Sequence, residues 1–169
     1  MHNYLHLIHQ YNQFVLDHII KKGLSLEKVQ SVNTTLKEFH IQVNGCFVIG
    51  LPGETRANIQ ETIDFALGLD LDSVAFSIAT PYPGSELYSM CKHNIINHDF
   101  SNFRLNVATM NTDHLSSHEI EHLRDRAYLQ FQANKFIKHP FNYLTARQNY
   151  ETMARQVKRI VGAKIGACV

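Results

Sequence analysis

The chain has 169 residues, of which 44% are hydrophobic and 18% are charged, and its formal net charge at pH 7 is +1. This composition excludes an intrinsically disordered chain and supplies enough apolar side chains for one core. A net charge this close to zero argues against a protein that binds nucleic acid or an anionic membrane through its overall field.

The first eleven residues, MHNYLHLIHQY, are rich in histidine and aromatic side chains, and we predict a frayed amphipathic end there. His2, His6 and His9 have a helix-compatible spacing that could hold a metal ion, which is the alternative reading of this stretch. The segment lacks the charged start and apolar centre of a signal peptide, and no apolar run in the sequence reaches the roughly 20 residues of a membrane span. We therefore expect a cytoplasmic protein with no membrane partner.

Helical and extended patterns alternate through the middle of the chain. Residues 43–49 and 73–78 form short apolar runs that predict parallel strands, the first of them buried on both faces. Apolar residues at helical spacing and good N-cap residues predict the helices. The predicted helices are residues 11–21, 25–39, 55–67, 85–92 and 116–138, with a final helix after Pro140 over roughly residues 142–160. This order predicts an α/β fold with a two-stranded parallel sheet.

Four local features add detail to this outline. The apolar stripe of the helix over residues 25–39 consists of Val29, Val32, Leu36 and Phe39. His40 follows that helix, where a left-handed conformation would cost a non-glycine residue about 1 kcal/mol. Cys91 is predicted to lie in the core. Residues 94–113 are polar and aperiodic, and predict a long surface crossing with Phe100 and Phe103 packed against the body.

The cysteines give no sign of a disulfide or an iron–sulfur site. Cys46, Cys91 and Cys168 are far apart in sequence and form no CxxC or CxxxCxxC spacing. We expect no metal ligand among them.

Residues 118–122 read HEIEH, which matches the HExxH pattern of zinc proteases. In that pattern two histidines one helical turn apart bind the metal and the glutamate acts as the base. At about 100° per residue, His118 and His122 lie opposite the apolar stripe of the same helix. That stripe consists of Ile120, Leu123, Ala127 and Phe131. Because the histidines point to solvent and no third ligand is evident, we expect no zinc site.

Residues 45–54, GCFVIGLPGE, give the most informative pattern in the chain. A buried strand ends at Gly50, Pro52 and Gly53, and Thr55 can then cap a helix. Ligands of parallel α/β folds bind at the carboxyl ends of strands, and glycine lets a ligand approach the backbone closely. Taken alone, the pattern favours a turn that uses glycine for its geometry only.

The exact strings are more specific. GLPGET, followed further along by SIATPYPGSELY, resembles the later half of the radical S-adenosylmethionine (radical SAM) enzymes, and most closely the branch with an additional cobalamin-binding domain. The resemblance covers about residues 12–134 and implies the last two parallel βα units of a partial (β/α) barrel with a helical C-terminal extension. The implied domains are a divergent N-terminal tail at 1–11, the barrel part at 12–113 and the extension at 114–169. The strand that should precede the first helix is expected to be missing.

The resemblance also implies positions for the cofactor and the substrate. By motif position, two groups of residues would border the adenosyl half of S-adenosylmethionine, one on the first strand and loop and one beside the adenine: Val48, Gly50 and Glu54, then Ile78 and Ala79. Thr80 and Tyr82 would face the substrate. No catalytic residue and no metal ligand is implied within this chain.

Departures from the family pattern limit the implied function. Complete relatives hold a 4Fe-4S cluster on a CxxxCxxC motif, and the cluster reduces S-adenosylmethionine to give a 5′-deoxyadenosyl radical. That motif is absent here, as are the segments that bind the amino group and the ribose. We therefore expect a truncated radical SAM enzyme that is inactive alone. The alternative is a non-catalytic binding module, or a half-barrel subunit completed by a chain that carries the missing N-terminal half, with no nucleic acid bound.

Overall fold

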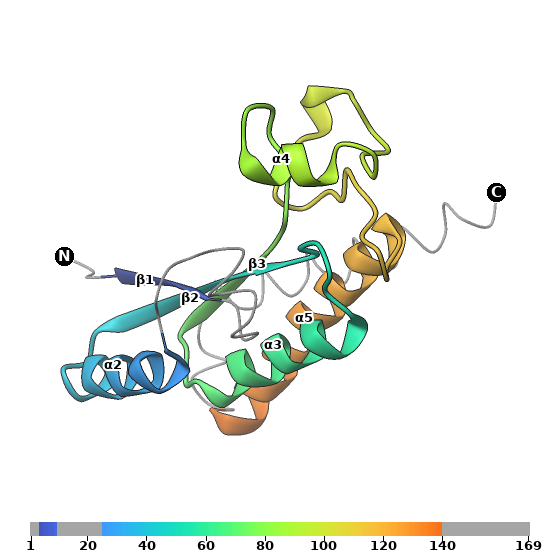
Figure 1. Cartoon of the computed structure of the whole chain (residues 1–169). Helices are drawn as coiled ribbons and strands as arrows, with labels where there is room; N and C mark the ends of the chain where they lie inside the picture. The colour runs from blue at the N-terminus through green and yellow to red at the C-terminus, as the bar shows by residue number, and fades with distance from the viewer. Residues whose placement is uncertain (1–3, 10–24, 140–169) are drawn as a thin grey trace. The chain divides into compact units, whose positions relative to one another are not determined.

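The computed structural model describes residues 4–9 and 25–139, and Figure 1 draws the helices and strands that they form. The chain divides into two compact units, Met1–Arg124 and Asp125–Val169. The sheet and the helices before residue 117 belong to the first unit, whereas the boundary between the units falls within the last described helix. The helices predicted over residues 11–21 and 142–160 lie outside the described residues, as does Cys168.

The sheet has three parallel strands in the order β1-β2-β3, formed by Tyr4–His9, Gln42–Ile49 and Ser73–Ile78. The two strands predicted from the apolar runs are confirmed. The prediction of a frayed N-terminal end with no preceding strand was wrong, because Tyr4–His9 pairs with β2 along its whole length. Tyr, Leu and Ile favour extended backbone, and pairing satisfies backbone groups that the edge of β2 would otherwise expose.

The helices begin at the residues that the capping pattern predicted. They are α2 (Leu26–Glu38), α3 (Arg56–Gly68), α4 (Glu86–Cys91) and α5 (Ser117–Lys138), with a 3-10 turn, η2, at Phe100–Asn102. Ser25, Thr55 and Ser85 are N-caps whose side-chain oxygens each accept a backbone N–H three residues later. Ser116 and Glu119 form the predicted capping box at the start of α5.

The end of α2 uses a residue other than glycine in a left-handed conformation. His40 has φ of 54°, and its N–H donates to the Lys37 carbonyl while the Ile41 N–H donates to the Leu36 carbonyl. These two hydrogen bonds form a Schellman motif, so His40 closes the helix in the left-handed conformation without a glycine. Phe39 is 72% exposed and does not belong to the buried stripe, because it lies past the last helical residue.

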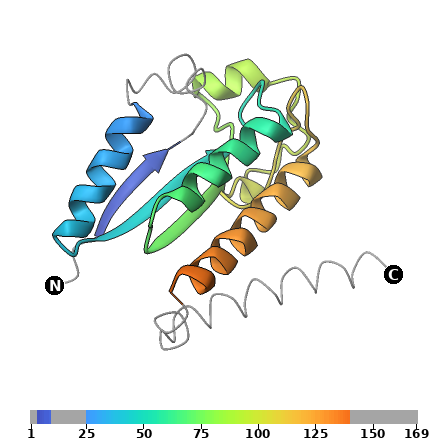
Figure 2. The same ribbon diagram turned by 90° about the horizontal axis from the view of Figure 1, so that it is seen from below.

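One face of the sheet is covered by helices, and α2 and α3 both lie against it (Figures 1 and 2). Along β2 the burial alternates: Val43, Phe47 and Ile49 are buried, whereas Cys46 and Val48 are only partly buried. The prediction that this strand is buried on both faces was therefore wrong. The described helices cover one side only, so every second residue of β2 remains partly accessible.

The crossing at residues 94–113 is partly ordered by pairing with itself. Ile95 and Met110 form an isolated antiparallel bridge. Phe103 is 8% exposed, as predicted, but Phe100 is 62% exposed, so its predicted packing against the body was wrong. Cys91 is buried, which confirms its assignment to the core. No helix among the described residues is long and apolar enough to cross a membrane.

Candidate functional site

The loop after β2 is a closed turn built around one glutamate. The Glu54 N–H donates to the Leu51 carbonyl at 3.1 Å, and Oε2 of Glu54 accepts the Leu51 N–H at 2.8 Å. Glu54 has no exposed surface, which is rare for a carboxyl side chain. The carboxyl group therefore holds the loop closed from inside, and Thr55 starts α3 immediately afterwards.

Two glycines of this loop have positive φ but different surroundings. Gly50 has φ of 79°, and a Cβ placed there would lie 2.9 Å from Cγ2 of Ile120. Gly53 has φ of 75°, and a Cβ placed there would meet no atom within 4 Å. Packing and conformation both require glycine at position 50. At position 53 only the conformation does, and this part of the backbone is open to an approaching ligand.

Backbone hydrogen bonds join the carboxyl end of β3 to β2 on one side and to the crossing on the other. The Ala79 N–H donates to the Ile49 carbonyl at 2.9 Å, and the Ile78 N–H donates to the Leu105 carbonyl at 2.7 Å. Thr80 is 9% exposed and donates its hydroxyl to the Ile78 carbonyl at 3.1 Å. The segment that leaves β3 is thus fixed against both the loop and the crossing.

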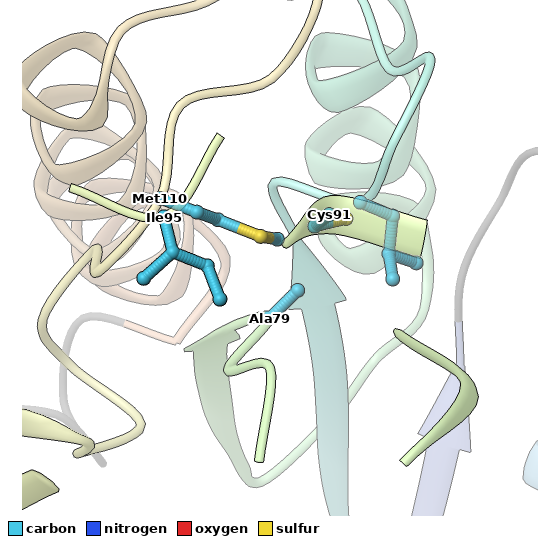
Figure 3. Close-up of a cluster of buried hydrophobic side chains, with 5 residues drawn as sticks. Ala79, Cys91, Ile95 and Met110 are labelled. Carbon is cyan, nitrogen blue, oxygen red and sulfur yellow. The ribbon is translucent and has the colours of Figure 1, made fainter. Parts of the chain in front are cut away.

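A small hydrophobic cluster lies over these strand ends. Figure 3 shows the cluster formed by Ala79, which directly follows β3, Cys91 of α4, and Ile95 and Met110 of the crossing. Leu51 of the glycine loop completes the cluster, and Val48 packs against it. Burial raises the pKa of the Cys91 thiol, and the charge of Asp113 raises it further. Cys91 is therefore a protonated core residue at neutral pH.

The crossing is anchored by the first turns of α5. Oε1 of Glu121 accepts the Ala108 N–H at 3.0 Å, and Nη1 of Arg124 donates to the Asn106 carbonyl at 3.0 Å. Sequence reasoning missed both residues. Their spacing of three positions on one helix face was the available signal.

The second face of the sheet carries small and polar side chains. Register pairs Cys46 with Ala75 and Val48 with Ser77, and all four residues are partly buried. Burial raises the pKa of the Cys46 thiol, so it too is protonated at neutral pH and is a poor nucleophile. Sequence reasoning missed this face, although the alternation with Phe47 and Ile49 indicated it.

The HEIEH segment lies in the first turns of α5, and its Glu119 helps to cap the helix. His118 and His122 are both exposed, as the helical geometry predicted, with ring centroids 4.6 Å apart. Glu119 accepts hydrogen bonds from Ser116 and from Nη2 of Arg56 at 2.8 Å. The hydrogen bond from the Ser116 N–H lowers the pKa of the Glu119 carboxyl group most, and the bonds from the Ser116 hydroxyl and from Arg56 lower it further. No three His, Cys, Asp or Glu side chains in residues 25–139 are grouped to hold a metal ion, and zinc binding stays untested.

Comparison with known proteins gives the family. No family model matches the chain. It is 34% identical over 114 residues to an uncharacterized methyltransferase of Pyrococcus horikoshii, covering 66% of this chain and 25% of that protein. It is 26% identical over 139 residues to an anaerobic magnesium-protoporphyrin IX monomethyl ester cyclase of Rubrivivax gelatinosus, covering 82% of this chain and 25% of the cyclase. Both relatives are radical SAM proteins. The chain belongs to the radical SAM superfamily.

Further matches agree with this assignment. The chain is 34% identical over 85 residues to a cytidylyl-2-hydroxyethylphosphonate methyltransferase of Streptomyces wedmorensis, covering 47% of this chain and 16% of that enzyme. The radical SAM chain thus spans a quarter or less of the length of these three relatives.

The residues that the radical SAM resemblance assigned to the cofactor lie around the carboxyl ends of β2 and β3. Gly50 and Ala79 are brought together by the bond between the strand ends, and Val48 and Ala79 meet at the same hydrophobic cluster. Ile78 pairs in register with Ile49 on the helix-covered face, opposite to Val48. The roles of these residues toward S-adenosylmethionine stay predictions.

The substrate-facing roles of Thr80 and Tyr82 likewise stay predictions. Thr80 is largely buried, whereas Tyr82 is 47% exposed and donates its hydroxyl to the Phe103 carbonyl at 3.1 Å. The open side of Gly53 fits a ligand that approaches the backbone. The described cysteines do not fit a 4Fe-4S cluster, because Cys46 and Cys91 belong to no group of potential ligands.

Proposed function

We propose that this chain is a portion of a radical SAM enzyme, and that it supplies the wall of the active site facing the adenosyl half of S-adenosylmethionine. One observation carries the proposal: a glycine loop, closed from inside by a buried glutamate, stands at the carboxyl end of β2 with the Gly53 backbone open. Parallel α/β folds bind ligands at this end of the sheet.

The residues of the loop have separate tasks in this proposal. Glu54 fixes the backbone of Leu51 before the ligand arrives, so that little conformational entropy is lost on binding. Gly53 leaves room for the adenosyl group to approach the main chain. Ala79, bonded to Ile49, holds the end of β3 beside the loop and offers an apolar surface to the adenine.

The chemistry of the complete enzyme needs more than these residues. In complete relatives a 4Fe-4S cluster supplies the electron that cleaves S-adenosylmethionine. We propose that this chain alone is inactive, since its residues contain no CxxxCxxC motif. The names of the three relatives describe methyl transfer and cyclisation, and the proposed reaction class for the complete protein lies among these. A cobalamin domain and a cytoplasmic location belong to the same proposal.

A second candidate is a half-barrel subunit or binding module that another chain completes. The partly accessible face of the sheet favours it, because Cys46 and Val48 would then face the inside of a closed barrel. The partner would carry the missing N-terminal half, and neither nucleic acid nor a membrane would be bound. The DNA upstream of the Met1 codon discriminates between the two candidates. An adjoining frame that encodes CxxxCxxC indicates a split or frameshifted enzyme whose two parts together make the active site, and its absence favours a remnant that survives as a binding module.

The adenosyl site is tested by calorimetric titration of S-adenosylmethionine into the unmodified chain and two valine variants. Gly53→Val places a β-branched residue at positive φ in the loop, where such residues are strongly disfavoured. Gly68→Val is the matched control, because Gly68 lacks positive φ and a Cβ there would also meet no atom within 4 Å. We expect the first variant to bind at least about tenfold more weakly, a loss of about 1.4 kcal/mol.

Thermal melts of the same variants separate binding from folding. We expect Gly53→Val to weaken binding more than it lowers the melting temperature. Saturable binding that is equally tight in the unmodified protein and in Gly53→Val would refute the proposed site, as would the absence of any saturable binding.

A further inference from the structure

Two adjacent residues in the first turns of α5 contact different sides of the proposed adenosyl site. Ile120 is 0% exposed, and a Cβ placed at Gly50 would lie 2.9 Å from its Cγ2, so the glycine loop packs closely against this helix. The next residue, Glu121, contacts the crossing, because its Oε1 accepts the Ala108 N–H at 3.0 Å. The same stretch of helix therefore fixes both the loop after β2 and the crossing.

Backbone hydrogen bonds connect this part of the crossing to the end of β3. The Leu105 carbonyl accepts the Ile78 N–H at 2.7 Å, and the Asn106 carbonyl accepts a hydrogen bond from Nη1 of Arg124 at 3.0 Å. Residues 105–108 are thus bonded to β3 at one end and to α5 at the other. Each residue has only two soft backbone torsions, so a segment this short and this closely bonded passes a shift at one end to the other.

The bond from the Ala108 N–H to Glu121 is the contact in this chain that is best suited to a test. Ala108 is 7% exposed, so its N–H has little access to water and loses its partner when the Glu121 side chain is truncated. A buried donor left without a partner is costly, and the segment is expected to move toward water to satisfy it. Arg124 is 3% exposed, so its replacement would disturb packing as well as the hydrogen bond.

We propose that Glu121 is a positioning residue of the adenosyl site, which holds the crossing against Ile78 and so fixes the end of β3 relative to the glycine loop. This inference rests on the proposed function, because it explains how two borders of that site keep their spacing. Glu121 acts through the backbone of Ala108 and Leu105 and not by contact with the ligand. A ligand that touches both borders loses less entropy on binding when their spacing is already fixed.

The first test compares Glu121→Ala with Glu121→Gln, because glutamine keeps a side-chain oxygen that can accept the Ala108 N–H. Glu61→Ala is the matched control, since it removes a carboxylate from an exposed position of α3. Amide hydrogen exchange followed by NMR measures the effect without any ligand. We expect Glu121→Ala to speed exchange of the Ala108 and Ile78 amides about tenfold, and the other two variants to change it less than about twofold.

The amides of β2 are the internal reference for this experiment. Their unchanged exchange in Glu121→Ala would show that the variant is folded and that the effect is local. Equal acceleration of the β2 amides would indicate a general loss of stability and would overturn the proposal. An Ile78 amide that exchanges at the unmodified rate in Glu121→Ala would also overturn it, because the crossing would then not pass the shift to β3.

The second test is calorimetric titration of S-adenosylmethionine into the same proteins. We expect Glu121→Ala to bind about fivefold more weakly or worse, and Glu121→Gln to restore the affinity to within about twofold. Equal affinity in Glu121→Ala and the unmodified chain would overturn this inference alone, as would a loss in Glu121→Gln as large as in Glu121→Ala. The absence of saturable binding in the unmodified chain would refute the proposed function and this inference with it, so the two failures are distinguishable.

Discussion

Replacing Phe47 with alanine tests whether the face of β2 under the helices carries the stability of the first unit. Phe47 is 1% exposed, and its ring stacks on that of Phe76 with centroids 5.4 Å apart and an interplanar angle of 29°. The substitution loses the transfer free energy of the ring and leaves a cavity, which together cost about 3 to 5 kcal/mol. Proteins of this kind are stable by about 5 to 15 kcal/mol, so the loss is a large share of the total.

Urea and thermal unfolding followed by circular dichroism measure this cost. We expect Phe47→Ala to lower the melting temperature by roughly 6 to 20 °C, on a scale of about 2 to 4 °C per kcal/mol at this chain length. Phe39→Ala is the control, since it removes the same ring from a 72% exposed position and should change the free energy of unfolding by less than about 0.5 kcal/mol. A cost below about 1.5 kcal/mol for Phe47→Ala, or a similar cost for both variants, would refute the reasoning.

Three further predictions concern metals and pH. Anaerobic reconstitution with iron and sulfide should give no stoichiometric 4Fe-4S cluster; one cluster per chain, lost when the cysteines are replaced, would contradict this. His118→Ala and His122→Ala should leave the zinc content measured by mass spectrometry unchanged, because both rings are exposed; one zinc per chain abolished by either change would show the opposite. Glu119 has a lowered pKa, so its contribution to stability is present above about pH 4.3 and is lost as pH falls through the lowered value. The difference in melting temperature between the unmodified chain and Glu119→Gln should therefore shrink on acidification. A difference that grows on acidification would contradict this prediction.

The elements were predictable where local chemistry alone decides them. Ser25, Thr55 and Ser116 cap their helices with their own side chains, so the sequence contains the start signal. Residues 73–78 were predicted as a strand at the bounds that the structure has. The first strand was missed because nothing within Tyr4–His9 distinguishes a paired strand from a frayed end until β2 is beside it.

The site was predictable in its backbone and less so in its surroundings. Gly53 follows proline in the string Gly-Leu-Pro-Gly, a sequence typical of a turn that needs positive φ at the glycine, and its φ in the structure is 75°. The complete burial of Glu54 and the anchoring of the crossing by Arg124 depend on packing between segments that are separated in the sequence. Local sequence patterns therefore do not reveal them. The exposure of Phe100 depends in the same way on where the crossing runs, which an aperiodic sequence does not determine.

The hydrogen bond from the Ile78 N–H to the Leu105 carbonyl also bears on how the sheet can grow. An open edge strand is a template for pairing with other polypeptides, and natural proteins protect such edges with loops. A strand that adds to the carboxyl end of β3 must first displace the crossing. Among the described strands β1 forms the other edge of the sheet. We therefore expect a polypeptide that extends this sheet to add more readily beside Tyr4–His9 than beside the carboxyl end of β3.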